Sequence, residues 1–200
     1  MHLNSELLFK KYALEYFKPG CKILEIGPDK FPSSYETWAA GNFVGWHTLD
    51  LRDRPLLTHR AASDYSFPFP DDVYDIVLSG QVMEHVRKPW VWIREVARVC
   101  KAGGLVITIA PASWPYHVAP GVPDCWRVFP EGMHALYEDA GLTMIFSCFE
   151  SLELPQFRRS IPGRSWTDQG RIWKVHRILG KFGLPIERSF DTIAIGRKNA

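Results

Sequence analysis

The stretch that most constrains the fold runs from Lys22 to Asp29 and reads Lys-Ile-Leu-Glu-Ile-Gly-Pro-Asp. Its apolar run ends in an acid and a glycine, and a second apolar run, Phe43–Leu49, ends in Asp50, 23 residues after Gly27. A strand, a glycine turn, a helix and a second strand ending in an acid are typical of a nucleotide-binding α/β unit. The glycine lets the backbone approach a ligand, and the acid accepts hydrogen bonds from ribose hydroxyls. The sequence therefore predicts a site for a nucleotide-like ligand.

Length and composition fit a single domain over residues 1–200, because 200 residues with 46% apolar content can bury a sizeable core. No apolar run reaches the roughly 18 residues that a membrane-spanning helix needs. Residues 1–18 form an amphipathic pattern that predicts a helix rather than a signal peptide. The cysteines are scattered without a CxxC pair, which predicts reduced thiols, a cytoplasmic protein and no metal site; they are Cys21, Cys100, Cys125 and Cys148.

The charges are distributed unevenly along the chain. Residues 151–200 hold ten Lys/Arg against four Asp/Glu, whereas residues 1–150 hold 14 against 18. We expect residues 151–190 to form a basic, lid-like insertion that can meet a phosphate or a uronate. A solvated basic face, or a segment that forms a homodimer, would explain the same charges.

Strand patterns alternate with helix patterns along most of the chain. This order predicts a Rossmann-like, doubly wound α/β fold with a mostly parallel seven-stranded sheet, helices on both faces and an antiparallel edge strand. The expected strands cover 21–26, 43–49, 56–58, 73–79, 105–110, 142–149 and 191–196. The expected helices cover the first turns of the chain, the segment after 32–33, 89–100, 130–140 and 171–179, with a tight turn at 101–104.

Four ordered segments between Lys22 and Gly141 resemble the class I S-adenosylmethionine-dependent methyltransferases. They are KILEIGPD, WHTLD, SDYSFPFPDDVYDIVLSGQVMEHV and WIREVARVCKAGGLVITIAP. The resemblance implies S-adenosylmethionine as cofactor, with Asp50 on the ribose, Asp64 on the adenine amine and Tyr65 packed on the adenine ring. The full set of cofactor-binding residues that it implies is Glu25, Gly27, Pro28, Asp50, Leu51, Asp64, Tyr65, Ser79, Gly80 and Gln81. Asp50 and Asp64 can also be read as ordinary turn residues.

The glycine turn departs from the family pattern of three alternating glycines. Asp29 stands at the second glycine position and Phe31 at the third. Asp tolerates a left-handed backbone better than most residues, so the turn itself can form. We expect the Asp29 side chain to weaken cofactor binding unless it points away from the site.

The long, proline-rich segment 111–130 is the expected acceptor loop, because loops of this length in compact domains are usually functional. His117 and Asp124 are the candidate catalytic pair, with the histidine as general base for a hydroxyl. The expected substrate-binding residues are Glu84, His85, Tyr116, Trp126 and Arg127. A purely structural reading competes with this one: His117 and Asp124 would fix the loop, and Arg127 would pair with an acid.

Other functions compete with a methyltransferase that modifies a hydroxyl of a small molecule or glycan. A nicotinamide-dependent dehydrogenase is disfavoured, because the turn lacks the GxGxxG spacing. Methylation of a nucleobase amine is disfavoured, because Ser79-Gly80-Gln81-Val82 stands where such enzymes have an Asn/Asp-Pro-Pro-aromatic run. An RNA methyltransferase that uses the basic segment is disfavoured, because the eight tryptophans form no obvious stacking platform. A catalytically inactive methyltransferase-like protein, used for binding or assembly, stays open because of Asp29 and Phe31.

Overall fold

The computed structural model describes residues 3–41, 43, 45–118, 121–153 and 189–200. Its centre is a seven-stranded sheet with the order β3-β2-β1-β4-β5-β7-β6. Strands β1 to β5 pair in parallel, and β7 runs antiparallel to both β5 and β6. The strands are β1 (Lys22–Ile26), β2 (Gly45–Asp50), β3 (His59–Arg60), β4 (Tyr74–Gly80), β5 (Cys100–Ser113), β6 (Leu142–Glu150) and β7 (Phe190–Lys198). The predicted fold class is confirmed, and β7 supplies the antiparallel pairings at one end of the sheet.

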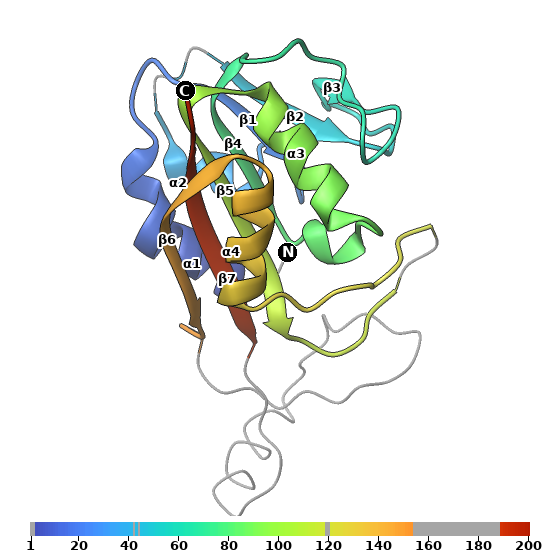
Figure 1. Ribbon diagram of the computed structural model, residues 1–200. Helices are drawn as coiled ribbons and strands as arrows, with labels where there is room; N and C mark the ends of the chain where they lie inside the picture. The colour runs from blue at the N-terminus through green and yellow to red at the C-terminus, as the bar shows by residue number, and fades with distance from the viewer. Residues whose placement is uncertain (1–2, 42, 44, 119–120, 154–188) are drawn as a thin grey trace, which may run out of the picture.

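Helices cover both faces of the sheet (Figure 1). Helices α3 (Pro89–Val99) and α4 (Pro130–Asp139) lie on one face, where Trp92, Ile93 and Tyr137 belong to a buried apolar cluster. On the other face lie α2 (Ser34–Ala39) and the N-terminal turns, which are α1 (Leu3–Leu8), the π-helical η1 (Phe9–Ala13) and the 3-10 helix η2 (Leu14–Tyr16). Leu8, Phe9 and Tyr35 from these elements form a second cluster with the sheet. The sheet is therefore buried on both sides, as its continuous apolar strands predict.

The segment Lys101–Gly104 differs from its prediction as a tight turn after a helix. It belongs to β5, where the register jumps from Tyr74 opposite Cys100 to Ile76 opposite Leu105. The strand therefore bulges at this point. Glycine is required inside the bulge, because a Cβ at Gly104 would lie 2.9 Å from the carbonyl oxygen of Asp75.

Two further predictions concern the acceptor loop after β5 and the lid over residues 151–190. Strand β5 continues to Ser113, so the part of the expected acceptor loop without helix or strand begins at Trp114. The expected lid over 151–190 and the expected helix over 171–179 fall almost wholly outside the described residues. No helix in the described ranges is long and apolar enough to cross a membrane.

Candidate functional site

The turn after β1 is held close to the ends of two neighbouring strands. The Gly27 amide donates a hydrogen bond to the carbonyl oxygen of Leu49 at 2.8 Å, which ties the turn to β2. Gly27 has φ +71°, and a Cβ at this position would collide with the Val82 side chain after β4. Both observations require glycine here. The turn thereby lies at the carboxyl ends of β1, β2 and β4, where ligands bind in open α/β sheets.

The Asp29 side chain is turned toward helix α2. Its carboxylate accepts hydrogen bonds from the Ser34 amide at 2.9 Å and from the Ser34 hydroxyl at 2.7 Å. An acid at a helix N-terminus satisfies amide groups that have no partner within the helix. The residue that replaces the second glycine of the family pattern is thus bound to the start of α2.

Glu25 lies beneath this turn and is 1% exposed. Its carboxylate accepts hydrogen bonds from the Ser33 hydroxyl and, at 2.9 Å, from the Trp46 indole nitrogen. Burial raises the pKa of Glu25 to about 8 despite these two hydrogen bonds, which lower it. In this structure Glu25 binds the scaffold around the turn, so it can act on a ligand only by positioning the backbone.

Asp50 ends β2 with its side chain 9% exposed. Its carboxylate accepts a hydrogen bond from the Arg52 amide at 3.0 Å and pairs with the Arg52 and Arg54 guanidinium groups at 3.3 and 3.4 Å. Arg54 also donates to the carbonyl oxygens of Pro28 and Asp29. The Arg54 side chain therefore bridges the ends of β1 and β2, across the place where the sequence predicts the ribose.

An open pocket of about 510 Å³ lies beyond Asp50. It is lined by Leu51, Arg60, Ala61, Ala62, Ser63, Asp64 and Tyr65, so it brings together three of the residues expected to hold the cofactor. The Tyr65 hydroxyl accepts a hydrogen bond from the Lys88 amide at 3.2 Å, which fixes its ring. Burial raises the pKa of Asp64.

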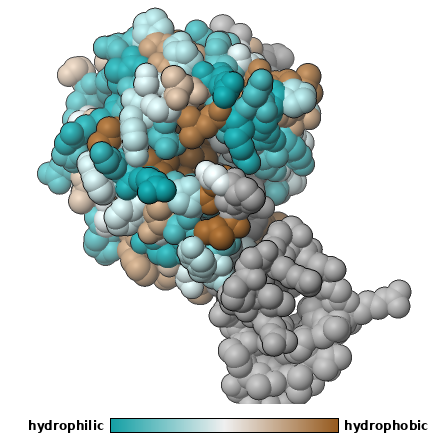
Figure 2. Space-filling model, turned by 90° about the vertical axis from the view of Figure 1, so that its right-hand side faces the viewer, coloured by the Kyte–Doolittle hydropathy of each residue, from teal (hydrophilic) through white to brown (hydrophobic). Residues whose placement is uncertain are grey.

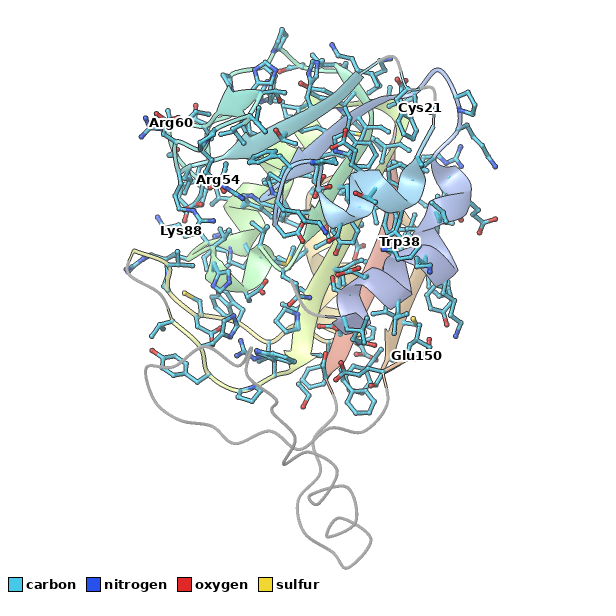
Figure 3. All side chains as sticks on the ribbon, turned by 180° about the vertical axis from the view of Figure 1, so that it is seen from behind. Cys21, Trp38, Arg54, Arg60, Lys88 and Glu150 are labelled. Atoms are coloured by element: carbon cyan, nitrogen blue, oxygen red, sulfur yellow. The ribbon has the colours of Figure 1, made fainter. Side chains whose placement is uncertain are left out.

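Basic side chains lie on the same side of the molecule as this pocket. Figure 2 shows one face of the molecule, where brown, hydrophobic residues gather in the middle with hydrophilic residues around them. Figure 3 shows Arg60, which lines the pocket, with Arg54 and Lys88 along the side that lies away from Trp38 and Glu150.

The end of β4 is more enclosed than the sequence suggests. Gly80 is covered by Tyr35, since a Cβ at Gly80 would collide with the Tyr35 ring and hydroxyl. The Tyr35 hydroxyl in turn lies 2.5 Å from the Ser5 hydroxyl on α1. Ser79 is buried, and its hydroxyl has no hydrogen-bond partner among the described residues. Tyr35 was not among the predicted site residues, because only the folded chain brings α2 onto the end of β4.

Gln81 follows β4 in a left-handed conformation, with φ +60°. Its amide donates to the carbonyl oxygen of Ile109 at 2.8 Å, and its side-chain amide donates to Asp191 at 3.2 Å. Burial raises the pKa of Asp191 to about 7, against the hydrogen bonds that lower it. A residue other than glycine in this conformation costs energy and is often found at functional sites.

Glu84 and His85 lie in the short helix η3 (Met83–His85) directly after this turn. Glu84 is fully buried, and neither carboxylate oxygen has a hydrogen-bond partner among the described residues. Burial raises the pKa of Glu84 to about 8. His85 Nδ1 lies 2.6 Å from the carbonyl oxygen of Pro123, and burial is the largest cause that lowers the pKa of its imidazole.

The expected catalytic pair is held together by the acceptor loop. The Asp124 carboxylate is 1% exposed and accepts a hydrogen bond from the His117 amide at 2.8 Å. Arg127 binds both oxygens of the same carboxylate, at 2.6 and 2.8 Å. Burial alone would raise the pKa of Asp124, but the hydrogen bonds from Arg127 and His117 lower it on balance. The pairing of Arg127 with an acid agrees with the structural reading of this loop.

The imidazole of His117 faces the same region as that of His85. Its Nδ1 lies 3.2 Å from the carbonyl oxygen of Pro115 and 3.3 Å from Asp124, and the two imidazole rings are 5.1 Å apart in an edge-to-face arrangement. The fold therefore brings Glu84, His85, His117 and Asp124 together from the segments after β4 and β5.

The two aromatic residues expected to bind substrate differ in how they are held. Tyr116 is 69% exposed. Trp126 donates a hydrogen bond from its indole nitrogen to the carbonyl oxygen of Val86 at 2.9 Å and packs edge-to-face against Trp90. Both rings present apolar surface to solvent, which suits contact with a sugar or a planar ring.

Comparison with known proteins agrees with this fold. The protein family described as "Methyltransferase domain" matches residues 41–108. A methyltransferase of unassigned specificity from Mycolicibacterium vanbaalenii is 34% identical over 98 residues, which cover 44% of this chain and 38% of that protein. The chain thus matches well under half of that relative's length.

Two solved structures share the whole architecture at low sequence identity. An S-adenosylmethionine-dependent methyltransferase from Archaeoglobus fulgidus superposes with a TM-score of 0.61 at 15% identity, covering 96% of this chain and 92% of that one. Phosphoethanolamine N-methyltransferase 2 from Haemonchus contortus, solved with S-adenosyl-L-methionine, gives a TM-score of 0.59 at 11% identity and covers 96% of this chain and 52% of that one. At these identities the likeness shows the fold.

The fold is a doubly wound α/β domain, a class in which ligands bind at the carboxyl ends of the parallel strands. The family model over residues 41–108, the relative and the shared architecture all point to methyltransferases and support the resemblance to the class I S-adenosylmethionine-dependent enzymes. That resemblance implies S-adenosylmethionine as the cofactor. Asp64 and Tyr65, the residues that the sequence predicts at the adenine, line the same open pocket.

Proposed function

We propose that this protein transfers a methyl group from S-adenosylmethionine to a hydroxyl oxygen of a small molecule or glycan. Binding of the cofactor is supported by one observation. Leu51, Asp64 and Tyr65 line a single pocket, which lies next to the Asp50 carboxylate. A single methyltransferase domain acting in the cytoplasm is part of the same proposal.

In this proposal, different residues along the carboxyl edge of the sheet bind different parts of the cofactor. Asp50 accepts hydrogen bonds from the ribose hydroxyls, for which an ionised carboxylate is the stronger acceptor. Asp64 accepts from the adenine amine, and Tyr65 packs on the ring. When bound, S-adenosylmethionine supplies a methyl group on a positively charged sulfur.

The acceptor side of the proposal rests on the segment after β5. His117 accepts the proton of the hydroxyl, and Asp124 holds the imidazole with Nδ1 protonated. Because Arg127 already neutralises Asp124, we assign Asp124 a positioning role rather than the proton. Tyr116 and Trp126 offer ring surface to a sugar or phenol.

The proposed methyl transfer to a hydroxyl is tested by an acceptor screen with the full chain. The protein is incubated with S-adenosylmethionine and a panel of sugars and phenols, and release of S-adenosylhomocysteine is measured. For an accepted compound, His117→Ala should lower turnover about 100-fold, whereas His134→Ala, on the exposed side of α4, should leave it unchanged. Equal turnover of the two variants would remove His117 from the reaction.

One observation favours an alternative, a methyltransferase-like protein that binds or assembles without catalysis. Arg54 spans Asp50 and the carbonyl oxygens of Pro28 and Asp29, so a cofactor must first displace its guanidinium. If S-adenosylhomocysteine binds neither the wild type nor an Arg54→Ala variant, this alternative replaces the proposal.

A further inference from the structure

Three potential metal ligands meet at one point of the structure, although they are spread over 34 residues of sequence. One ligand atom from each of Glu84, His85 and His117 lies within 4.8 Å of the others. Within this group, His85 Nε2 lies 3.7 Å from Glu84 Oε1. Two ligands bound at 2.0–2.1 Å to one tetrahedral ion lie about 3.3 Å apart, so this pair is already close to the required spacing.

Glu84 gives the cluster a feature that packing alone does not explain. Its side chain is fully buried, and both carboxylate oxygens lack a hydrogen-bond partner among the described residues. An unsatisfied buried carboxylate is costly, and buried charges are usually paired or bound to a metal. Glu84 therefore points to a cation that completes its surroundings.

Both histidines are oriented as metal ligands usually are. His85 Nδ1 faces the carbonyl oxygen of Pro123, which can only accept, so Nδ1 carries the proton and Nε2 keeps its lone pair. His117 Nδ1 likewise faces only acceptors, the Pro115 carbonyl and the Asp124 carboxylate, which leaves Nε2 as its ligand atom. Hydrogen bonds of this kind to the second ring nitrogen fix ligand histidines in metal sites.

The charges around the cluster also suit a cation. The charged groups that act most strongly on Glu84 include the carboxylates of Asp191 and Asp124 and the guanidinium of Arg127. Arg127 is bound through two nitrogens to Asp124, so its charge is compensated.

We propose that Glu84, His85 and His117 bind a divalent transition-metal ion such as Zn²⁺. Two imidazoles and one carboxylate suit zinc and its neighbours, whereas Mg²⁺ and Ca²⁺ prefer oxygen ligands. Three protein ligands leave a coordination position open, to which an oxygen of an acceptor can bind. With an ion in place, His117 is a ligand rather than a base. The metal site itself does not depend on the proposed methyl transfer.

The test is metal binding by the full chain after removal of metals with a chelator. Co²⁺ is titrated and followed by its visible absorption, and Zn²⁺ is titrated in competition with a coloured chelator. We expect one ion per chain with micromolar or tighter affinity, and no competition from millimolar Mg²⁺. Glu84→Gln and His117→Gln should each weaken binding roughly tenfold or more.

The chain offers a matched control in a second histidine pair. The rings of His47 and His59 lie 4.9 Å apart, and among the described residues they belong to no group of three potential metal ligands. His59→Gln should leave the affinity unchanged. Glu84→Gln keeps the shape of the buried side chain, and thermal unfolding of each variant without metal shows that it folds.

Two results would overturn the proposal. One is wild-type protein that binds neither Co²⁺ nor Zn²⁺ at millimolar concentration. The other is binding that His59→Gln weakens as much as Glu84→Gln does, because the ion would then be held at histidines elsewhere. A metal-dependent rise of the unfolding temperature in the wild type, and its loss in Glu84→Gln, would support the assignment by a second readout.

Discussion

Asp50 is the residue on which the proposed cofactor site depends most. We predict that Asp50→Ala weakens S-adenosylhomocysteine binding by about 1.5–3 kcal/mol, the contribution of hydrogen bonds to a charged group. Calorimetric titration measures this change. Asp53→Ala is the control, since it removes an exposed carboxylate three residues away. A dissociation constant unchanged by Asp50→Ala would exclude Asp50 from the site.

Arg54 occupies groups that the proposed cofactor site would use. Because its guanidinium binds Asp50 and two backbone carbonyls, a ligand at the ribose position must break these contacts. We predict that Arg54→Ala strengthens S-adenosylhomocysteine binding about two- to tenfold, since a mutation that frees the competent conformation removes that cost. Arg52→Ala, at a side chain that is 66% exposed, should have little effect. Weaker binding by Arg54→Ala would show instead that Arg54 contacts the ligand.

Glu25 should make folding stability depend on pH. Its pKa is about 8 in the folded protein against a usual 4.5, so folding favours the protonated acid. Its stabilising contribution is complete below pH 4.5 and is lost as the pH rises toward 8. We predict that Glu25→Gln, which keeps an acceptor for Ser33 and Trp46, gains stability relative to wild type across this range, reaching roughly 2–4 kcal/mol at pH 8.

Denaturant unfolding of both proteins at pH 5 and pH 8 measures that gain. Other buried acids titrate equally in the two proteins, so the difference between them isolates Glu25. A difference that stays constant between the two pH values would show that Glu25 is ionised in the folded state throughout.

At the scale of elements, Tyr137 is a main contact between α4 and the sheet. Tyr137 is fully buried, and its hydroxyl donates a hydrogen bond to the Thr108 hydroxyl on β5 at 3.0 Å. Its ring packs against Gly196 on β7, where a Cβ would lie 2.5 Å from the ring carbon Cδ1. The absence of a side chain at Gly196 therefore allows α4 to approach β7.

We predict that Gly196→Ala lowers the free energy of unfolding by about 1–3 kcal/mol through overpacking against Tyr137. Gly132→Ala is the matched control on α4, because the nearest atom to its Cβ would be 3.6 Å away and alanine favours a helix. Thermal or denaturant unfolding compares them. Equal stability of Gly196→Ala and wild type would mean that α4 shifts without cost.

The strands and helices could largely be predicted from the sequence, because their apolar runs end at turn residues such as Gly27 and Gly141. The predicted turn over 101–104 was wrong, because pairing with β4 draws these residues into β5 as a bulge. Local pattern cannot show such an effect of a neighbouring strand.

The site was predictable only in part, for a related reason. Asp50, Asp64 and Tyr65 follow strands in a recognisable order, and the pocket brings Asp64 and Tyr65 together beside Asp50. Tyr35 over Gly80 and Arg54 across the turn after β1 depend on contacts between distant segments. The cluster of Glu84, His85 and His117 also forms only when the segments after β4 and β5 meet, so no ligand spacing revealed it.

At the scale of the whole molecule, two apolar clusters hold helices on both faces of the sheet. The proposed cofactor pocket, beyond β2, and the proposed acceptor and metal groups, after β4 and β5, lie along the carboxyl edge of this sheet. The central claim is therefore that the edge binds S-adenosylmethionine or its product.

Calorimetric titration of the full chain with S-adenosylhomocysteine, with NAD as the control ligand, tests that claim most directly. The account predicts one site per chain with micromolar affinity for S-adenosylhomocysteine and no heat of binding for NAD. Binding of neither ligand, or of NAD alone, would contradict it.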